Sequence, residues 1–261
     1  MIGTDKYSYQ SRLKTVDPTA KIVLTASSMV LCLGTNGIAV SIFTIVFFCA
    51  VSALWGGTAV NTFLRLMRAP LFFLLVGTVT VIFSRFPNWD GVLIGMQIGD
   101  WIYGLSIASL FRGVRLVARA MGCVASVYFT VLSTPITDLM LAFRRMHLPQ
   151  LFLSLMELIY RFIFLLYETA QRIHTAQASR LGYNGLKRSY ESLGMLISMV
   201  FMKAYRKSDK IYTSLEARGY TGELCTLAPL YESGRRMYWV CAGLTAVQLA
   251  LFLIERSVVP F

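Results

Sequence analysis

Long runs of apolar residues, separated by short polar breaks, restrict most strongly what this chain can fold into. Ile38–Trp55 and Tyr238–Ile254 each approach the roughly 20 apolar residues that a membrane-spanning helix needs. Only 15% of the residues are charged, whereas an average soluble domain has about 25%. The sequence therefore predicts an integral membrane protein.

We expect about five membrane-spanning helices. Asp17-Pro18 opens the first, because Asp is a favoured N-cap and Pro loses no needed hydrogen bond in a first helical turn. Thr134-Pro135 ends the fourth, because the residue before a proline avoids helical geometry. From first to last, the predicted spans cover residues 18–33, 38–55, 70–83, 105–134 and 238–254.

The predicted fold is all-α, with a module of long amphipathic helices inserted between the fourth and fifth spans. Residues 1–134 hold the first four spans, residues 135–236 form the cytoplasmic or interfacial module, and residues 237–261 form the last span. Cytoplasmic segments of membrane proteins carry an excess of Lys and Arg. The net charge of +12 is therefore assigned to the inner side, near the anionic lipids of the bilayer, and not to a nucleic-acid partner. This assignment predicts a cytoplasmic N-terminus and module.

The module is predicted to contain two long helices, over residues 149–180 and 190–218. Glu168 and Arg172 form an acid-first i,i+4 pair on the first helix, as do Glu157 and Arg161. We expect this helix to lie along or obliquely in the inner interface and not to span the membrane. The second helix carries methionines that suit a contact surface able to repack: Met195, Met199 and Met202.

Both long helices end in a similar cluster of small residues and arginine, and Arg218 lies 38 positions (218 − 180) after Arg180. Glycine just past a helix takes the left-handed cap conformation at little cost, and arginine suits the negative end of the helix dipole. One interpretation stops there, with two ordinary helix ends. The other is that each arginine projects into an acidic groove on a partner, with small neighbours allowing close approach. The candidate partner-binding residues are Ala178, Arg180, Gly182, Ala217, Arg218 and Gly219.

Arg112, Arg115 and Arg119 share one helical face in the predicted fourth span. Charge in mid-membrane is costly. These arginines either reach the outer end of the helix, alone or paired with Asp90 or Asp100, or line a substrate path. The first interpretation is favoured, because long basic side chains snorkel to the interface.

No motif for catalysis, metal binding or nucleotide binding is present. His147 and His174 lie in no metal-binding array, and the cysteines form no CxxC pair. The chain also lacks a G-x-x-x-x-G-K-[ST] phosphate loop. We therefore expect a non-catalytic protein with no cofactor and no metal site.

Several motifs resemble the transmembrane coupling (T) component of energy-coupling factor importers, which are ABC-type transporters of bacteria. Residues 17–21 resemble the family's Asp-Pro-Arg-x-Lys entry to its first helix, with Thr19 in place of arginine. Residues 133–139 resemble its Thr/Ser-Pro-x-x-Leu boundary, and residues 217–219 match its Ala-Arg-Gly motif. The first arginine motif departs from the pattern, because Leu181 separates the arginine from the glycine. The details around both motifs are most similar to the cobalt and nickel branch.

The resemblance implies a scaffold protein that is moved by the ATP hydrolysis of partner subunits. In the family, the two arginine motifs dock into two cytosolic ABC ATPase subunits. The coupling helices then pass the ATPase movement to a substrate-binding membrane (S) subunit. It also implies a multi-pass protein of the bacterial inner membrane that serves cobalt, nickel or vitamin uptake.

Two other functions remain open from the sequence. The permease subunit of a conventional ABC importer also presents a helical loop to its ATPase. Such a subunit has one loop where this chain has two arginine tips, and its translocation path needs more intramembrane polar residues than this sequence offers. A membrane-embedded enzyme would need a nucleophile and a base that converge at the interface, and no Ser or Cys here has a supporting motif.

Overall fold

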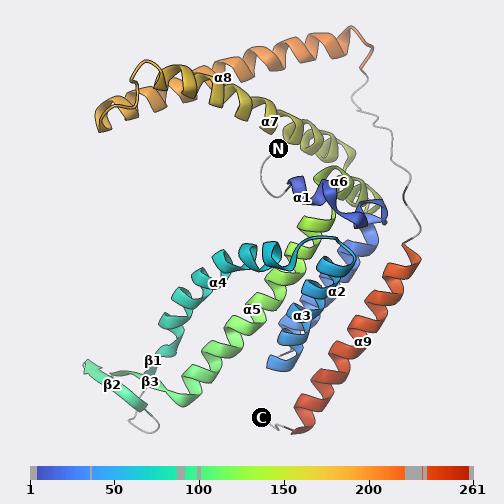
Figure 1. Cartoon of the computed structure of the whole chain (residues 1–261), viewed down its shortest axis with the longest axis vertical. Coiled ribbons are helices and arrows are strands. Elements are labelled where there is room, and N and C mark those ends of the chain that lie inside the picture. Colours follow the sequence, from blue (N-terminus) through green and yellow to red (C-terminus); the bar gives the residue numbers. More distant parts are fainter. Residues whose placement is uncertain are drawn as a thin grey trace. The chain divides into compact units, whose positions relative to one another are not determined.

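The computed structural model describes residues 5–35, 37–86, 92–98, 101–220, 231 and 234–258. The fold is all-α, with one short sheet between two of its helices (Figure 1). The helices are α1 Asp5–Gln10, the 3-10 helix η1 Arg12–Thr15, α2 Pro18–Gly34, α3 Ile38–Leu54, α4 Val60–Ile82, α5 Ile107–Ser133, α6 Ile136–Arg145, α7 Gln150–Ala178, α8 Leu186–Glu216 and α9 Arg235–Val258. The strands are β1 Phe83–Phe86, β2 Val92–Ile98 and β3 Trp101–Ser106, all antiparallel in the order β1-β3-β2.

The chain divides into two compact units. We call residues 2–139 with 230–261 the bundle unit, and residues 140–229 the tip unit. By length and composition, α4, α5, α7 and α9 are the helices of the described residues that could cross a membrane, and α2 and α3 are shorter apolar helices. The protein is therefore a multi-pass membrane protein. The interfacial placement of α7 stays a prediction.

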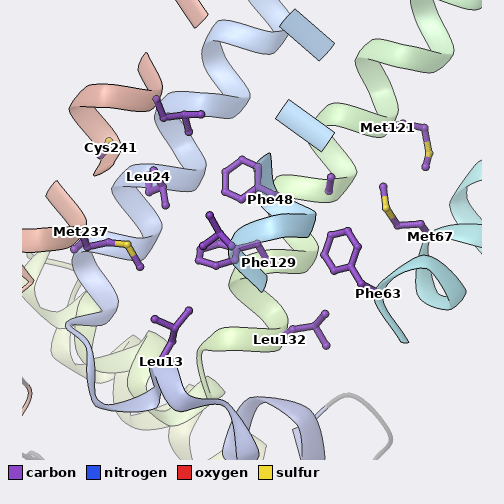
Figure 2. Packing of buried hydrophobic residues seen from close by; sticks show 14 residues of the cluster. Leu13, Leu24, Phe48, Phe63, Met67, Met121, Phe129, Leu132, Met237 and Cys241 are labelled. Carbon is purple, nitrogen blue, oxygen red and sulfur yellow. The ribbon is translucent and has the colours of Figure 1, made fainter. Parts of the chain in front are cut away.

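In the bundle unit, α2, α3, α5 and α9 run side by side (Figure 1). Apolar side chains from each of them meet in one cluster, in which the Phe48 and Phe129 rings lie 5.3 Å apart between centroids (Figure 2). Leu24 of α2 and Cys241 of α9 lie in the same cluster, and Phe63 of α4 reaches it from the other side. The core of the bundle therefore holds helices from both ends of the chain together.

Polar contacts also join these helices inside the bundle. Gln248 of α9 is fully buried, and its Nε2 donates to Ser28 Oγ of α2 at 3.1 Å and to Thr44 Oγ1 of α3 at 2.9 Å. At one end of α3, the Ile38 N–H donates to Glu255 Oε1 at 3.1 Å. Interhelical hydrogen bonds of this kind hold membrane helices together where lipid supplies no hydrophobic drive.

The entry to α2 confirms the expected cap and adds a buried lysine. Asp17 accepts hydrogen bonds from the Thr19 N–H at 3.0 Å and the Thr19 hydroxyl at 2.6 Å, and Pro18 is the first helical residue. The Lys21 side chain is only 1% exposed. Its Nζ donates to Leu13 O at 2.6 Å and to the carbonyl of Ser133 at 3.1 Å, at the negative end of the α5 dipole. One amine thus joins η1, α2 and α5.

Two expectations for the bundle unit need correction. The third helix begins at Val60, not at Pro70, and carries Pro70 in its interior; Figure 1 shows that α4 bends along its length. Membrane helices tolerate such prolines because neighbouring groups satisfy the freed backbone. The segment before α5 forms β2 and β3, which the sequence did not predict. Phe83, where the predicted third span ends, already lies in β1, and residues 87–91 lie outside the described residues.

Candidate functional site

The first candidate tip, residues 178–182, follows the end of α7. The Gly182 N–H donates to Gln177 O at 2.9 Å, and the Leu181 N–H donates to Ala178 O at 3.0 Å. These crossed bonds form a Schellman motif, which satisfies carbonyls that the helix end leaves without partners. Arg180 occupies the position immediately before the left-handed residue of the motif, and its side chain is exposed.

The second candidate tip, residues 217–220, repeats this pattern after α8. The Tyr220 N–H donates to Leu215 O at 3.0 Å, and the Gly219 N–H donates to Glu216 O at 2.9 Å. Arg218 is exposed and again immediately precedes the left-handed residue. The two arginines therefore hold equivalent positions in two equivalent caps.

The flanking small residues do not pair as the sequence suggested. Ser179 and Ala217 share the same backbone conformation, with φ −61° in both and ψ −22° and −20°. The counterpart of Ala217 is therefore Ser179. Ala178 corresponds to Glu216, one residue earlier, and remains exposed at the end of α7.

Glycine was expected to take the left-handed conformation at both tips, and this is wrong at the first tip. Gly219 has φ 71°, as expected, but at the first tip Leu181 has φ 58°. A left-handed residue that is not glycine costs roughly 1–2 kcal/mol, because its Cβ crowds the following carbonyl. Gly182 is needed for a different reason: a Cβ there would lie 2.7 Å from Ser192 Oγ and 2.9 Å from Gln177 O.

A hydrogen-bonded brace holds the first tip against the start of α8. Ser192 Oγ donates to Gly182 O at 2.7 Å, and Gln177 Nε2 donates to Ser192 O at 3.0 Å. The Tyr183 hydroxyl donates to Gln177 Oε1 at 2.8 Å, and the Tyr183 ring lies 4.5 Å from that of His174 between centroids. No sequence pattern predicts this brace, because Ser192 lies ten positions after the glycine it contacts.

The second tip is more open. A Cβ at Gly219 would meet nothing within 4 Å. Nearby on α8, Tyr212 hydrogen bonds to the Glu216 carboxylate, which raises the pKa of Tyr212 above its ordinary value. The two caps thus share a backbone pattern and differ in their surroundings.

The length of α8 separates the two tips, because one precedes this helix and the other follows it (Figure 1). A helix of 31 residues is about 46 Å long at 1.5 Å per residue. Two arginines that far apart cannot enter one groove. They can contact two separate binding sites on a large partner or on two partner subunits.

Three glycines allow a test of these local roles. Gly182→Ala is expected to destabilise the first turn by about 1–3 kcal/mol through overpacking, and Ser192→Ala should recover part of that loss. Gly219→Ala should cost about 1 kcal/mol through backbone strain, with no such recovery. Gly194→Ala, in the interior of α8 with open space around it, should instead stabilise its helix by up to about 1 kcal/mol.

Amide hydrogen exchange of the purified chain in detergent checks these three outcomes. We expect faster exchange around residues 181–192 for the first variant, around residues 215–220 for the second, and slower exchange within α8 for the third. Equal effects of all three substitutions would contradict the distinction between steric contact and left-handed strain.

The other candidate residues form no comparable arrangement. On α5, Arg112 is exposed while Arg115 and Arg119 are half-buried. No group of three or more His, Cys, Asp or Glu side chains in the described part of the chain is arranged to hold a metal ion. His147 follows α6 in a left-handed conformation, and the His174 ring packs against Tyr183 in the brace.

Comparison with known proteins adds the evidence for the family. Residues 10–227 match the CbiQ family, described as cobalt transport protein. The chain belongs to the CbiQ family. It is 29% identical over 223 residues to the cobalt transport protein CbiQ of Salmonella typhimurium, which covers 85% of this chain and 99% of that protein.

The match to the CbiQ family extends to energy-coupling factor proteins. The chain is 30% identical over 218 residues to the energy-coupling factor transporter transmembrane protein EcfT of Thermosediminibacter oceani, covering 79% of each. It is 25% identical over 195 residues to EcfT of Staphylococcus aureus, covering 67% of this chain and 72% of that protein. This CbiQ-family chain is therefore a transmembrane component of an energy-coupling factor type transporter and works with other transporter subunits.

Proposed function

We propose that this chain is the coupling subunit of a metal-ion importer, in which its two tips bind two cytosolic ABC ATPase subunits. One observation carries the proposal: Arg180 and Arg218 occupy the same position in two matching caps, at opposite ends of one long helix. Matching ends favour a partner with two similar halves. A separation of about 46 Å favours one half per tip.

Each arginine is proposed to enter an acidic groove on its ATPase subunit. Arginine presents a rigid, always-charged fork that binds carboxylates bidentately. Its place after the last helical turn keeps the side chain clear of the helix, and the braced cap holds the first tip in position. The small exposed residues beside it, Ala178 and Ala217 among them, leave room for the partner backbone.

The same unit offers a surface for the substrate-binding membrane (S) subunit. Ser198, Met199, Met202, Lys203 and Arg206 line a shallow, open hollow on α8. Methionine side chains adapt to changing partners, so this face of α8 suits contact with a subunit that moves during the cycle. In this proposal ATP hydrolysis belongs to the ATPase subunits, and this chain carries out no catalysis.

The cargo and the setting complete the proposal. Relatives named cobalt transport proteins support cobalt, and the family resemblance of the sequence leaves nickel as the alternative ion. ATPase subunits use cytosolic ATP, so residues 135–236 would face the cytoplasm of a bacterial cell, between the spans of residues 1–134 and 237–261. The excess of basic residues in this module agrees with that side.

Co-purification from membranes tests the proposal. Tagged wild-type chain is expected to bring down ATP-hydrolysing subunits, and Arg180→Glu or Arg218→Glu is expected to weaken the association by roughly 30-fold or more. Truncating one partner of a desolvated charge pair costs about 2–5 kcal/mol, much of it from leaving the other charge buried and unpaired.

Arg188→Glu provides the matched control, because Arg188 is exposed near the first tip but lies within α8. It should associate like wild type. Normal association of both tip variants, or no ATPase with wild type, would show that the tips are only helix caps.

A further inference from the structure

The strained residue at the first tip, Leu181, has no role in the function proposed so far. It adopts φ 58°, a conformation in which leucine is unfavourable and glycine is common. The equivalent position of the second tip is Gly219. Strain of this kind persists only where the surrounding structure enforces it, and it gathers at functional sites.

The surroundings of Leu181 do enforce it, without covering its side chain. The Schellman bonds fix its backbone from one side, and the bond from Ser192 Oγ to Gly182 O fixes the next residue. The leucine side chain is nevertheless 65% exposed. A rigid turn, held by hydrogen bonds, therefore exposes a large apolar side chain on the surface.

The position of Leu181 relates it to the partner. It directly follows Arg180, whose exposed side chain is the proposed docking group of the same tip. A partner that accepts this arginine must come within contact distance of the next residue. At the second tip, Arg218 has glycine there and presents no apolar side chain at that position.

We propose that Leu181 is a second docking residue, which enters an apolar wall beside the acidic groove on the ATPase subunit bound by the first tip. This inference rests on the proposed function. It assigns the first tip a mixed charged and apolar contact and the second tip a mainly charged one. The two tips then differ in how they bind, although their backbones match, and the first tip is the less sensitive to salt because apolar contacts are not screened.

Substitutions at this position separate folding from binding. Leu181→Gly and Leu181→Asn both introduce residues that accept the left-handed conformation, and asparagine is close to leucine in size. We expect a Tm equal to or above that of wild type for both variants. We expect association to fall about 10-fold or more, because an apolar side chain of this size loses its burial. Leu181→Met, which stays apolar, should keep the association.

The association is measured with the first tip alone. All variants are made in an Arg218→Glu background, and the probe is the purified ATPase subunit that co-purifies with the wild-type chain. Titration at low and at high salt follows the binding, and thermal unfolding in detergent follows the fold.

Two results would overturn the inference. One is normal binding by Leu181→Gly and Leu181→Asn while Arg180→Glu in the same background does not bind, which leaves the proposed function intact. The other is a lower Tm for Leu181→Gly, which would show that the leucine stabilises the turn. Normal binding by Arg180→Glu would instead contradict the proposed function itself.

Discussion

ATP-driven uptake of Co²⁺ should fall about 100-fold or more when either Arg180 or Arg218 is replaced by glutamate, even though each variant should still bind some of the ATPase subunits. The tips lie at the two ends of α8, so in the proposed function each variant would keep one intact contact with the ATPase subunits. Two linked contacts bind much more tightly than either alone, and loss of one leaves the affinity of the other. Coupling requires that both ends move with the partner, so one remaining contact would tether the ATPase without transmitting its movement.

The measurement is uptake of radioactive Co²⁺ into proteoliposomes that contain this chain, the ATPase subunits and the substrate-binding subunit. The amount of ATPase retained by each variant is measured in the same vesicles. Arg188→Glu serves as the control and should transport like wild type. A single tip variant that transports at more than about half of the wild-type rate would contradict a coupling role for that tip. Loss of a buried contact between arginine and a carboxylate is expected to weaken binding by far more than twofold.

Replacing Lys21 by methionine should destabilise the bundle unit by about 3 kcal/mol. The substitution keeps most of the volume but removes a buried donor that bonds to Leu13 O and Ser133 O. Each hydrogen bond to a charged group is worth about 1.5–3 kcal/mol, and buried carbonyls left without partners add to the loss. The carboxylate of Asp138, which is 7% exposed, would also lose the electrostatic attraction of the amine.

Thermal unfolding in detergent tests this expectation, since about 3 kcal/mol corresponds to a fall in Tm of roughly 6–12 °C for a chain of this size. Lys14→Met is the matched control. Lys14 is exposed and contacts the Tyr9 ring at 5.0 Å, so its loss should cost no more than about 1 kcal/mol. Equal falls in Tm for the two variants would contradict the expected stabilising role of the buried Lys21 amine.

Local chemistry allowed much of the helical fold to be predicted. Asp17-Pro18 marks the start of α2, and Thr134-Pro135 marks the end of α5 within a residue of the predicted position. Proline misled the prediction where tertiary context dominates, because Pro70 lies inside α4 and does not begin it. The strands before α5 depend on pairing between segments, which a pattern of apolar residues alone does not reveal.

The tips show the same division between local and distant causes. The two arginine clusters and their 38-residue offset are visible in the sequence, and so is the left-handed Gly219. The left-handed Leu181 is not, because a favoured residue, Gly182, stands next to it. Gly182 packs closely against Ser192. The left-handed residue is therefore Leu181, one position earlier than the glycine that conformational propensity favours. The docking roles of these residues stay a proposal.

An unbroken α8 also has a mechanical consequence. A rod about 46 Å long that pivots by about 10° around one end moves its other end by about 8 Å. If the tips bind two ATPase subunits as proposed, a small rotation of one subunit would become a displacement larger than a helical turn at the opposite tip. The length of α8 would also magnify any flexibility of the turn around Gly182. The rigidity of this turn would therefore determine how much of the movement at one tip reaches the other.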